Sequence, residues 1–369
     1  MEPIATFDAP PADAPPAEDA PEPRRARTWI LGVIAAVIVV IDLVSITVNL
    51  PYFELSPGTT SPVAPMITVP ANQRHPVSGA VMLTTVLLRQ ARPIDFVYAW
   101  FNHDVQIVSR ESILGNLPTG ELQQINNEEM QGSVQDAQVA ALRRLGYRVP
   151  EHGTGALVEE VVPKTPAAPV VHVGDTITAI DGRPVQLDTD VTTALVADHP
   201  GQNIALTLDR QGRTQNVAVT LTRRPDNPNR AFLGVALGTR GEHFDLPFKV
   251  SINSGDIGGP SAGLAFTLGI IDVLVNGKLT GGQRIAATGT IDPDGNVGDV
   301  GGVAEKTVSV SNAGAVLFLV PPGEYRDAVS HAGPHLKVVK VSTLDQALAA
   351  IAANGGDVSG VPPPPPAGQ

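Results

Sequence analysis

The chain has 369 residues, of which 43% are hydrophobic, so it is long enough for about two folded domains together with tails. Its formal net charge of -12 excludes a broad basic field of the kind that attracts nucleic acid. The absence of cysteine excludes disulfides, thiolate nucleophiles and cysteine-ligated metal sites. We therefore expect no nucleic-acid partner, no metal and no other cofactor.

The N-terminal region predicts a membrane anchor. Residues 1 to 27 are rich in Pro, Ala, Asp and Glu, and such a composition is typical of a disordered tail. Residues 28 to 50 form an apolar run long enough to cross a bilayer, with Asp42 as its one carboxylate. Three arginines precede this run, so the positive-inside rule predicts a cytoplasmic N-terminus, with the rest of the chain outside. Because the run lacks the cleavage site of a signal peptide, we expect an uncleaved, single-pass protein of the cell membrane.

Residues 51 to 150 carry no recognisable catalytic motif. We interpret them as a stalk and the N-terminal part of the extracytoplasmic region. Strand-like stretches are predicted at 79 to 86 and at 94 to 100. A helix is predicted over about 121 to 146, because apolar residues recur there at helical spacing, and it is expected to pack on the domains that follow.

Residues 151 to 224 are predicted to form a small β domain, since short strand-like runs alternate with turn signals. Residues 173 to 185 follow the pattern Val-Gly-Asp-x-Ile-x-x-Ile-x-Gly-x-x-Val and resemble PDZ domains of bacterial envelope proteases. The resemblance implies that an extended peptide adds to a strand edge. It also implies that the peptide carboxylate lies in a loop formed by Gly155, Ala156, Leu157 and Val158. A structural β domain without peptide binding is the plainer alternative.

Residues 231 to 352 alternate strand and helix patterns, which predicts a layered α/β domain. Residues 353 to 369 are predicted to be a disordered, proline-rich tail. The expected fold class is therefore a multidomain α+β or α/β protein with an N-terminal transmembrane helix, a PDZ-like β domain and a C-terminal α/β domain.

Ser261 is the first candidate catalytic residue. It lies between a glycine-rich turn that includes Gly259 and an apolar helix, and Pro260 is suited to the first helical turn. Backbone N–H groups at such a helix start can stabilise the oxyanion of a tetrahedral intermediate. Taken alone, a serine in this position is better explained as a helix cap.

Lys306 is the second candidate. On a helix over residues 303 to 312 it shares its face with small or apolar neighbours, namely Gly302, Val303, Ser309 and Val310. Burial on such a face lowers the pKa of a lysine toward neutrality, where the free amine can act as a general base. A lysine that extends to water is the plainer alternative.

Gly-Pro-Ser-Ala-Gly around Ser261, followed by Gly-Gly-Val-Ala-Glu-Lys ending at Lys306, resembles the Lon protease domain. In that family the matching serine and lysine form the catalytic dyad. The resemblance implies a proteolytic domain over residues 231 to 352, with Thr288 supporting the lysine and Asp256 and Gly259 supporting the serine. The loop after Asp256 is longer here than in the Lon pattern. The resemblance is therefore weaker at Asp256 than at Ser261 and Lys306.

Together with the PDZ-like segment and the anchor, this resemblance implies a membrane-anchored, PDZ-containing, Lon-like serine protease of bacteria. Its expected partners are protein or peptide substrates and the membrane, through residues 28 to 50. Because Lon relatives assemble into rings, a homo-oligomer is included among the expectations. The sequence contains no Gly-x-x-x-x-Gly-Lys-Ser/Thr loop, so we expect cleavage without ATP.

Two alternatives remain at this point. Gly-Pro-Ser-Ala-Gly also matches the Gly-x-Ser-x-Gly elbow of α/β-hydrolases and esterases, which requires a buried strand directly before the serine. The acids and histidines that follow in a permissible order are Asp292, Asp294, His331 and His335. The other alternative is a non-catalytic, membrane-tethered scaffold that binds peptides. Neither a His-Glu-x-x-His motif nor the pattern of a trypsin-like protease occurs in the sequence.

Overall fold

The computed structural model describes residues 24–102, 104–115, 119–275 and 278–363. The chain divides into two compact units, a smaller one of Met1–Ser56 with Leu88–Gly115 and a larger one of Pro57–Leu87 with Asn116–Gln369. Of the two expected tails, residues 1–23 and 364–369 lie outside the described residues, as does the side chain of Asp42. The tail residues 24–27 are helical.

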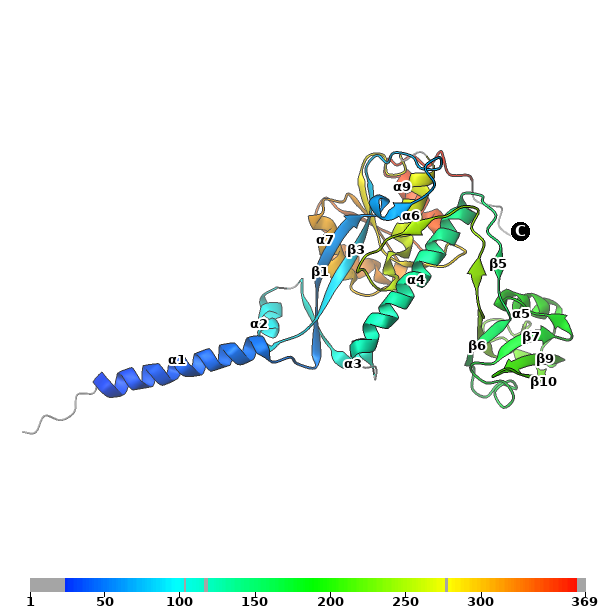
Figure 1. The fold of residues 1–369 in the computed structure, drawn as a ribbon, viewed down its shortest axis with the longest axis horizontal. Helices are drawn as coiled ribbons and strands as arrows, with labels where there is room; N and C mark the ends of the chain where they lie inside the picture. The colour runs from blue at the N-terminus through cyan, green and yellow to red at the C-terminus, as the bar shows by residue number, and fades with distance from the viewer. Residues whose placement is uncertain (1–23, 103, 116–118, 276–277, 364–369) are drawn as a thin grey trace, which may run out of the picture. The chain divides into compact units, whose positions relative to one another are not determined.

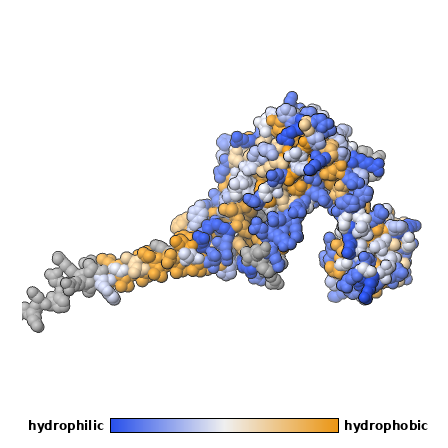
Figure 2. Space-filling view, in the orientation of Figure 1, coloured by the Kyte–Doolittle hydropathy of each residue, from blue (hydrophilic) through white to orange (hydrophobic). Residues whose placement is uncertain are grey.

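The smaller unit contains the apolar helix α1, Arg24–Thr47. Within it, Trp29–Thr47 is long and apolar enough to cross a membrane, by length and composition, and none of it is buried within the protein. Figure 2 shows a largely hydrophobic surface along this helix. The strand expected at 94 to 100 is wrong, since these residues form helix α2, Pro93–Phe101. Pro93 occupies the first turn, and the carboxylate of Asp95 accepts a 2.7 Å hydrogen bond from the backbone N–H of Arg92, which caps the helix.

A six-stranded sheet has the order β20-β19-β16-β3-β1-β4 (Figure 1). The four strands β3, β16, β19 and β20 pair in parallel, whereas β1 and β4 are antiparallel. The bounds of the strands are β1 Tyr52–Pro62, β3 Ala80–Gln90, β4 Gln106–Ser109, β16 Arg284–Ala287, β19 Leu317–Val320 and β20 Lys337–Lys340.

Helices cover both faces of the parallel strands, which makes the larger unit a three-layer α/β fold. Alternate side chains of a strand face opposite layers. Leu83 and Ile285 pack in one core with α4, α6 and α9, whereas Met82 and Ala286 pack in a second core with α7 and α8. The bounds of these helices are α4 Thr119–Arg144, α6 Gly263–Leu274, α7 Val303–Asn312, α8 Tyr325–His331 and α9 Leu344–Ala352.

The structure differs from the expected stalk over residues 51 to 150. Strand β3 lies between β1 and β16 in the main sheet, and α4 packs against α6. The apolar run that forms β3 is suited to burial on both faces, which a solvated stalk does not provide. The helix expected over 121 to 146 is confirmed as α4. The α/β fold therefore begins before the β domain, which is inserted into it along the sequence.

The β domain has its own sheet in the order β10-β9-β7-β6-β13, with β8 paired to β7, and its own hydrophobic core. Asp175 of the Val-Gly-Asp pattern is buried and accepts two hydrogen bonds from Arg210, of 2.7 and 2.6 Å. The bounds are β6 Ala156–Val161, β7 Thr176–Ile180, β8 Arg183–Pro184, α5 Asp188–Ala194, β9 Asn203–Arg210, β10 Arg213–Thr220 and β13 Val235–Thr239.

Part of the C-terminal segment also packs on the larger unit. Val358 and Val361 contact its core, and the carbonyl of Pro362 accepts a 2.6 Å hydrogen bond from Arg144. The disordered tail expected from residue 353 therefore does not extend over these residues. The remaining short elements are η1 Ala64–Met66, β2 Ile67–Thr68, α3 Arg110–Leu114, β5 Glu151–His152, η2 Leu195–Ala197, β11 Thr222–Arg223, β12 Ala231–Phe232, β14 His243–Phe244, β15 Ser251–Ile252, η3 Pro260–Ala262, β17 Thr290–Ile291, β18 Val297–Gly298 and η4 Pro322–Glu324.

Candidate active site

Ser261 lies in the single 3-10 turn η3 that leads into α6. The turn starts from Gly259, whose φ of +82° favours a residue without Cβ and whose N–H donates a 2.8 Å hydrogen bond to the carbonyl of Asn126. The N-cap of α6 is Ala262, so Ser261 is not the cap of that helix. The carbonyl of Ser261 accepts hydrogen bonds from the N–H of Gly289 at 3.0 Å and from Thr288 Oγ1 at 3.2 Å. Two donors from adjacent residues thereby hold the carbonyl of the serine.

Lys306 lies in the first half of α7 and is only 2% exposed. The expected helical face is confirmed, since Val303, Ser309 and Val310 are all buried. The ammonium nitrogen Nζ donates a 3.3 Å hydrogen bond to Thr288 Oγ1. Burial lowers the pKa of Lys306 to about 8, although the carboxylates of Glu324 and Glu305 act in the opposite direction. A large share of the amine is therefore neutral in mildly alkaline solution.

Ser261 and Lys306 line the same pocket, which has a volume of about 200 Å³. Asp256 is an exposed residue of its lining, and the buried Thr288 accepts a hydrogen bond from Lys306. The residues that line the pocket are Thr84, Thr85, Val86, Asp256, Ile257, Gly258, Ser261, Ala262 and Lys306. Lys306 is the one basic side chain in this lining, as far as the described residues go.

Two further segments contribute to the site and were missed from the sequence. Thr84 of β3 lines the pocket and donates a 3.4 Å hydrogen bond to the carbonyl of Lys306. Ser133 of α4 donates a 3.0 Å hydrogen bond to the carbonyl of Pro260, directly before the candidate nucleophile. The sequence contained a signal for Thr84, because two threonines interrupt the apolar run of β3. The contact from α4 carries no local signal, since it joins residues far apart in the sequence.

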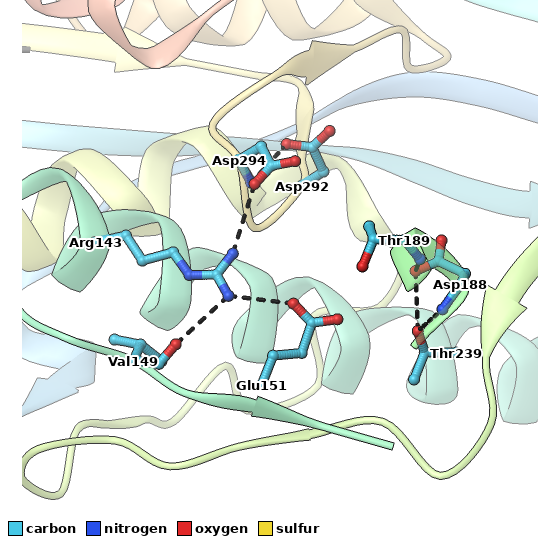
Figure 3. A network of polar contacts seen from close by, with 8 residues as sticks. All are labelled: Arg143, Val149, Glu151, Asp188, Thr189, Thr239, Asp292 and Asp294. Atoms are coloured by element: carbon cyan, nitrogen blue, oxygen red, sulfur yellow. Dashed lines mark hydrogen bonds and ion pairs between the residues drawn. The ribbon is translucent and has the colours of Figure 1, made fainter. Parts of the chain in front are cut away.

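The acids that the esterase alternative requires are engaged elsewhere. Asp294 forms a 3.5 Å ion pair with Arg143 near the end of α4, and Arg143 also binds Glu151 at 3.2 Å (Figure 3). Asp292 accepts hydrogen bonds from the backbone N–H groups of Asp294 and Asn296 and so stabilises its own turn.

The other requirements of that alternative are also unmet. The ring nitrogen Nδ1 of His331 lies 2.9 Å from the carbonyl of Asp327 within α8, and His335 is exposed. The chain before Ser261 is a loop rather than a strand from residue 253 onward. The geometry of an esterase elbow is therefore not present.

The residues expected to form a peptide cradle, Gly155, Ala156, Leu157 and Val158, do not lie at a free strand edge. Strand β6 starts at Ala156 and is paired on both sides, with β7 and with β13. Because an extended peptide adds only to an unpaired strand edge, β6 cannot receive one. Within the described residues, the edge strand that contacts helix α5 is β13. Thr239 of β13 and Asp188 of α5 are joined by hydrogen bonds of 3.0 and 3.1 Å (Figure 3).

Among the described residues, no three His, Asp or Glu side chains lie close enough together to hold a metal ion. The groups that the pocket brings together are the hydroxyl of Ser261 and the amine of Lys306, whose pKa is lowered, and the hydroxyl of Thr288 accepts a hydrogen bond from that amine.

Comparison with known families identifies both folded regions. Residues 243–353 match the C-terminal proteolytic domain of Lon protease (S16). They form a Lon-type proteolytic domain. Residues 143–221 match the PDZ domain family, so the Lon-type fold carries a PDZ domain in the sequence between α4 and α6. A serine-type peptidase domain is consistent with the pocket that contains Ser261.

Among curated relatives, the Lon protease of Malacoplasma penetrans is 35% identical over 106 residues, which is 27% of this chain and 13% of that protein. The Lon protease of Rickettsia typhi is 31% identical over 28% of this chain and 14% of that protein. The magnetosome formation protease MamE of Paramagnetospirillum magneticum is 35% identical over 18% of this chain and 9% of that protein. The chain thus spans only about an eighth of the length of the Lon proteases that it matches.

Among solved structures, the PDZ domain of an SdrC-like protein from Listeria monocytogenes is 24% identical and covers 23% of this chain and 87% of that chain. Its TM-score is 0.22. The assignment of the PDZ domain therefore rests on the family match and on the sheet described above.

Proposed function

We propose that the protein is a membrane-anchored serine endopeptidase that uses Ser261 as nucleophile and Lys306 as general base. The single observation that carries this proposal is that the buried amine of Lys306, with its pKa lowered to about 8, lines the same pocket as Ser261. The proposal is supported by the match of residues 243–353 to the Lon proteolytic domain.

The neutral amine of Lys306 takes the proton of the Ser261 hydroxyl as the oxygen attacks the carbonyl carbon of the scissile peptide. The lysinium then donates this proton to the leaving amine, and a water molecule hydrolyses the acyl-enzyme by the same sequence. Thr288 positions the lysine through its hydroxyl, and the backbone N–H groups of Ser261 and Ala262 in η3 stabilise the oxyanion. Gly259 permits the turn, and Asp256 lies at the pocket rim, where its carboxylate meets the incoming peptide.

The PDZ domain recognises an extended segment of the substrate along the free edge of β13, beside α5. This replaces the loop at residues 155 to 158 as the peptide-binding site. Support comes from the sheet order, which leaves β13 at an edge, and from its contact with α5.

The protein acts on accessible or already unfolded polypeptides and needs no ATP. Helix α1 anchors it in the membrane through Trp29–Thr47, with the N-terminus in the cytoplasm and the catalytic domain outside. The arginines that precede the apolar run support this orientation.

The test is covalent labelling of the full-length protein in detergent with a fluorophosphonate, followed by mass mapping. We expect the label on Ser261, loss of labelling in Lys306→Ala, and cleavage of unfolded casein that is unchanged by ATP. Lys249→Ala is the matched control, because Lys249 is an exposed lysine of the same unit. Labelling of any other residue would refute the dyad. Full cleavage activity of Lys306→Ala would show that Lys306 is not the base, whereas absence of cleavage by the unchanged protein would favour the non-catalytic scaffold.

A further inference from the structure

Helix α2 exposes an unusual set of side chains. Trp100 is 80% exposed and Phe101 is 79% exposed, and four more large side chains of this short helix are exposed as well. These four are Ile94, Phe96, Val97 and Tyr98. An exposed apolar patch of this kind in a folded protein marks a surface that contacts a partner.

The helix has no charged face of its own that would favour water. Its one ionisable acid, Asp95, is buried and receives a 2.8 Å hydrogen bond from Arg89. The same carboxylate caps the helix at Arg92. The exposed surface of α2 is therefore made of apolar and aromatic side chains, and the exposed Arg92 stands at its start.

The position of α2 next to the end of α1 indicates what its exposed apolar surface contacts. The N–H of Leu50 donates a 2.8 Å hydrogen bond to the carbonyl of Ala91, and the N–H of Ala91 donates a 2.9 Å hydrogen bond to the carbonyl of Tyr52. These bonds hold the start of α2 beside the residues that leave α1 at Thr47. The rings of Tyr52 and Phe96 meet edge to face, 5.3 Å apart.

Leu50 follows Thr47 by three positions along the chain, a distance of at most about 10 Å. This is comparable to the headgroup layer of a bilayer, which is roughly 5 to 8 Å thick on each side. A membrane that surrounds α1 therefore places α2 at headgroup depth. Trp and Tyr prefer that depth, because their rings are apolar while their N–H and O–H groups remain hydrated.

We infer that α2 is an interfacial helix that inserts its aromatic side chains into the headgroup region of the same membrane that α1 crosses. The inference rests on the proposed membrane anchor. A second copy of the chain is the competing occupant of this surface. Lipid is favoured because α2 contacts α1 within the same compact unit, so the patch adjoins the apolar surface of α1.

The chain contains two tryptophans, Trp29 in α1 and Trp100 in α2, so each can report separately. The full-length protein is reconstituted in phosphatidylcholine vesicles with acyl chains that are unbrominated, brominated near the headgroup, or brominated near the chain end. Trp29→Phe leaves Trp100 as the only indole, and Trp100→Phe leaves Trp29. We expect bromine near the headgroup to quench Trp100 strongly and bromine near the chain end to quench it less.

The outcomes separate the helix from the anchor. Quenching of Trp29 without quenching of Trp100 would overturn the inference and leave the anchor intact, with water or a second copy against α2. Quenching of neither would overturn both. Phe101→Asp, in the Trp29→Phe protein, should reduce the quenching of Trp100, because it places a charge on the inserted face. Gln106→Asp adds the same charge at an exposed polar position of the same unit and should leave the quenching unchanged.

Discussion

Lys306 Nζ and Thr288 Oγ1 are joined by a 3.3 Å hydrogen bond, and the same hydroxyl bonds the carbonyl of Ser261 at 3.2 Å. One buried threonine thus ties the candidate base to the backbone of the candidate nucleophile. Its hydroxyl sets the direction of the amine, while the serine carbonyl keeps a second donor in the N–H of Gly289.

Thr288→Val should therefore lower kcat/KM by about tenfold to a hundredfold, since one hydrogen bond to the base is lost. The variant keeps the shape of the side chain, so its thermal unfolding should change little. Thr288→Ser, which retains the hydroxyl, should restore most of the activity. Equal activity of the Val and Ser variants in a peptide-cleavage assay would contradict a positioning role for Thr288.

The pH dependence of cleavage follows from the pKa of Lys306, about 8. Only the neutral amine can accept the serine proton, so kcat/KM should rise about tenfold per pH unit below this pKa and level off above it. The measurement is the initial rate at low substrate concentration across mildly acidic to alkaline pH. A profile that falls as the pH rises through this range would rule out the free amine as base.

Burial of Lys306 also affects stability. The pKa of the folded state lies below that of the unfolded chain, 10.5, so between these values the unfolded chain binds more protons and the free energy of unfolding rises with pH. Below the folded pKa, the burial of the protonated lysine lowers the free energy of unfolding by its full amount, about 3 kcal/mol. Lys306→Met should remove it and raise the unfolding midpoint at neutral pH while abolishing cleavage. A lower midpoint for this variant would show that the amine is well compensated in the folded state.

The central position of β3 can be tested with two leucines of the same strand. Leu83 is fully buried in the core with α4 and α6, whereas Leu87 is 54% exposed. Leu83→Ala should lower the free energy of unfolding of the Lon-type domain by about 2 to 5 kcal/mol. Leu87→Ala should change it by less than about 0.5 kcal/mol. Equal effects in chemical denaturation would be expected of a stalk and would contradict the sheet order.

Hydrogen exchange can locate the peptide edge of the PDZ domain. A pool of short random peptides with free carboxyl termini should slow exchange in β13, residues 235–239, because an added strand protects its outward amides. Strand β10 at the opposite edge should exchange as before. The same pool with amidated termini is the control for carboxylate recognition. Protection confined to β10 would show that the peptide binds at the opposite edge of the sheet and would contradict the assignment to β13.

The local structure around Ser261 and Lys306 was predictable because its signals are local. The glycine turn before Ser261 and the small, apolar helical face of Lys306 both lie within a few residues of the side chain concerned. The helix over residues 303 to 312 was predicted with its observed bounds. The lowering of the pKa of Lys306 could also be predicted from that face alone, because helical periodicity fixes which residues lie beside the lysine.

The rest depends on pairing between distant segments, which a single sequence does not display. Whether β6 or β13 is the edge of the PDZ sheet is decided by hydrogen bonds across the domain. The apolar run of β3 indicated a buried strand, yet nothing local showed that its neighbour is β16. At residues 94 to 100, the aromatic and β-branched composition favoured a strand, while Pro93 and the cap by Asp95 stabilise a helix.

The parallel pairing of Ala80 with Arg284 has a consequence for synthesis of the protein. Strand β3 leaves the ribosome long before β16 is synthesised. Its apolar side chains therefore lack this neighbouring strand until most of the polypeptide has been translated. The inserted PDZ domain can fold during this interval, and the pairing of His152 with His243 brings its entry and exit together. Closing it first replaces a long, flexible loop by a short one and lowers the entropic cost of completing the sheet. The insertion thereby aids the assembly of the domain that it interrupts.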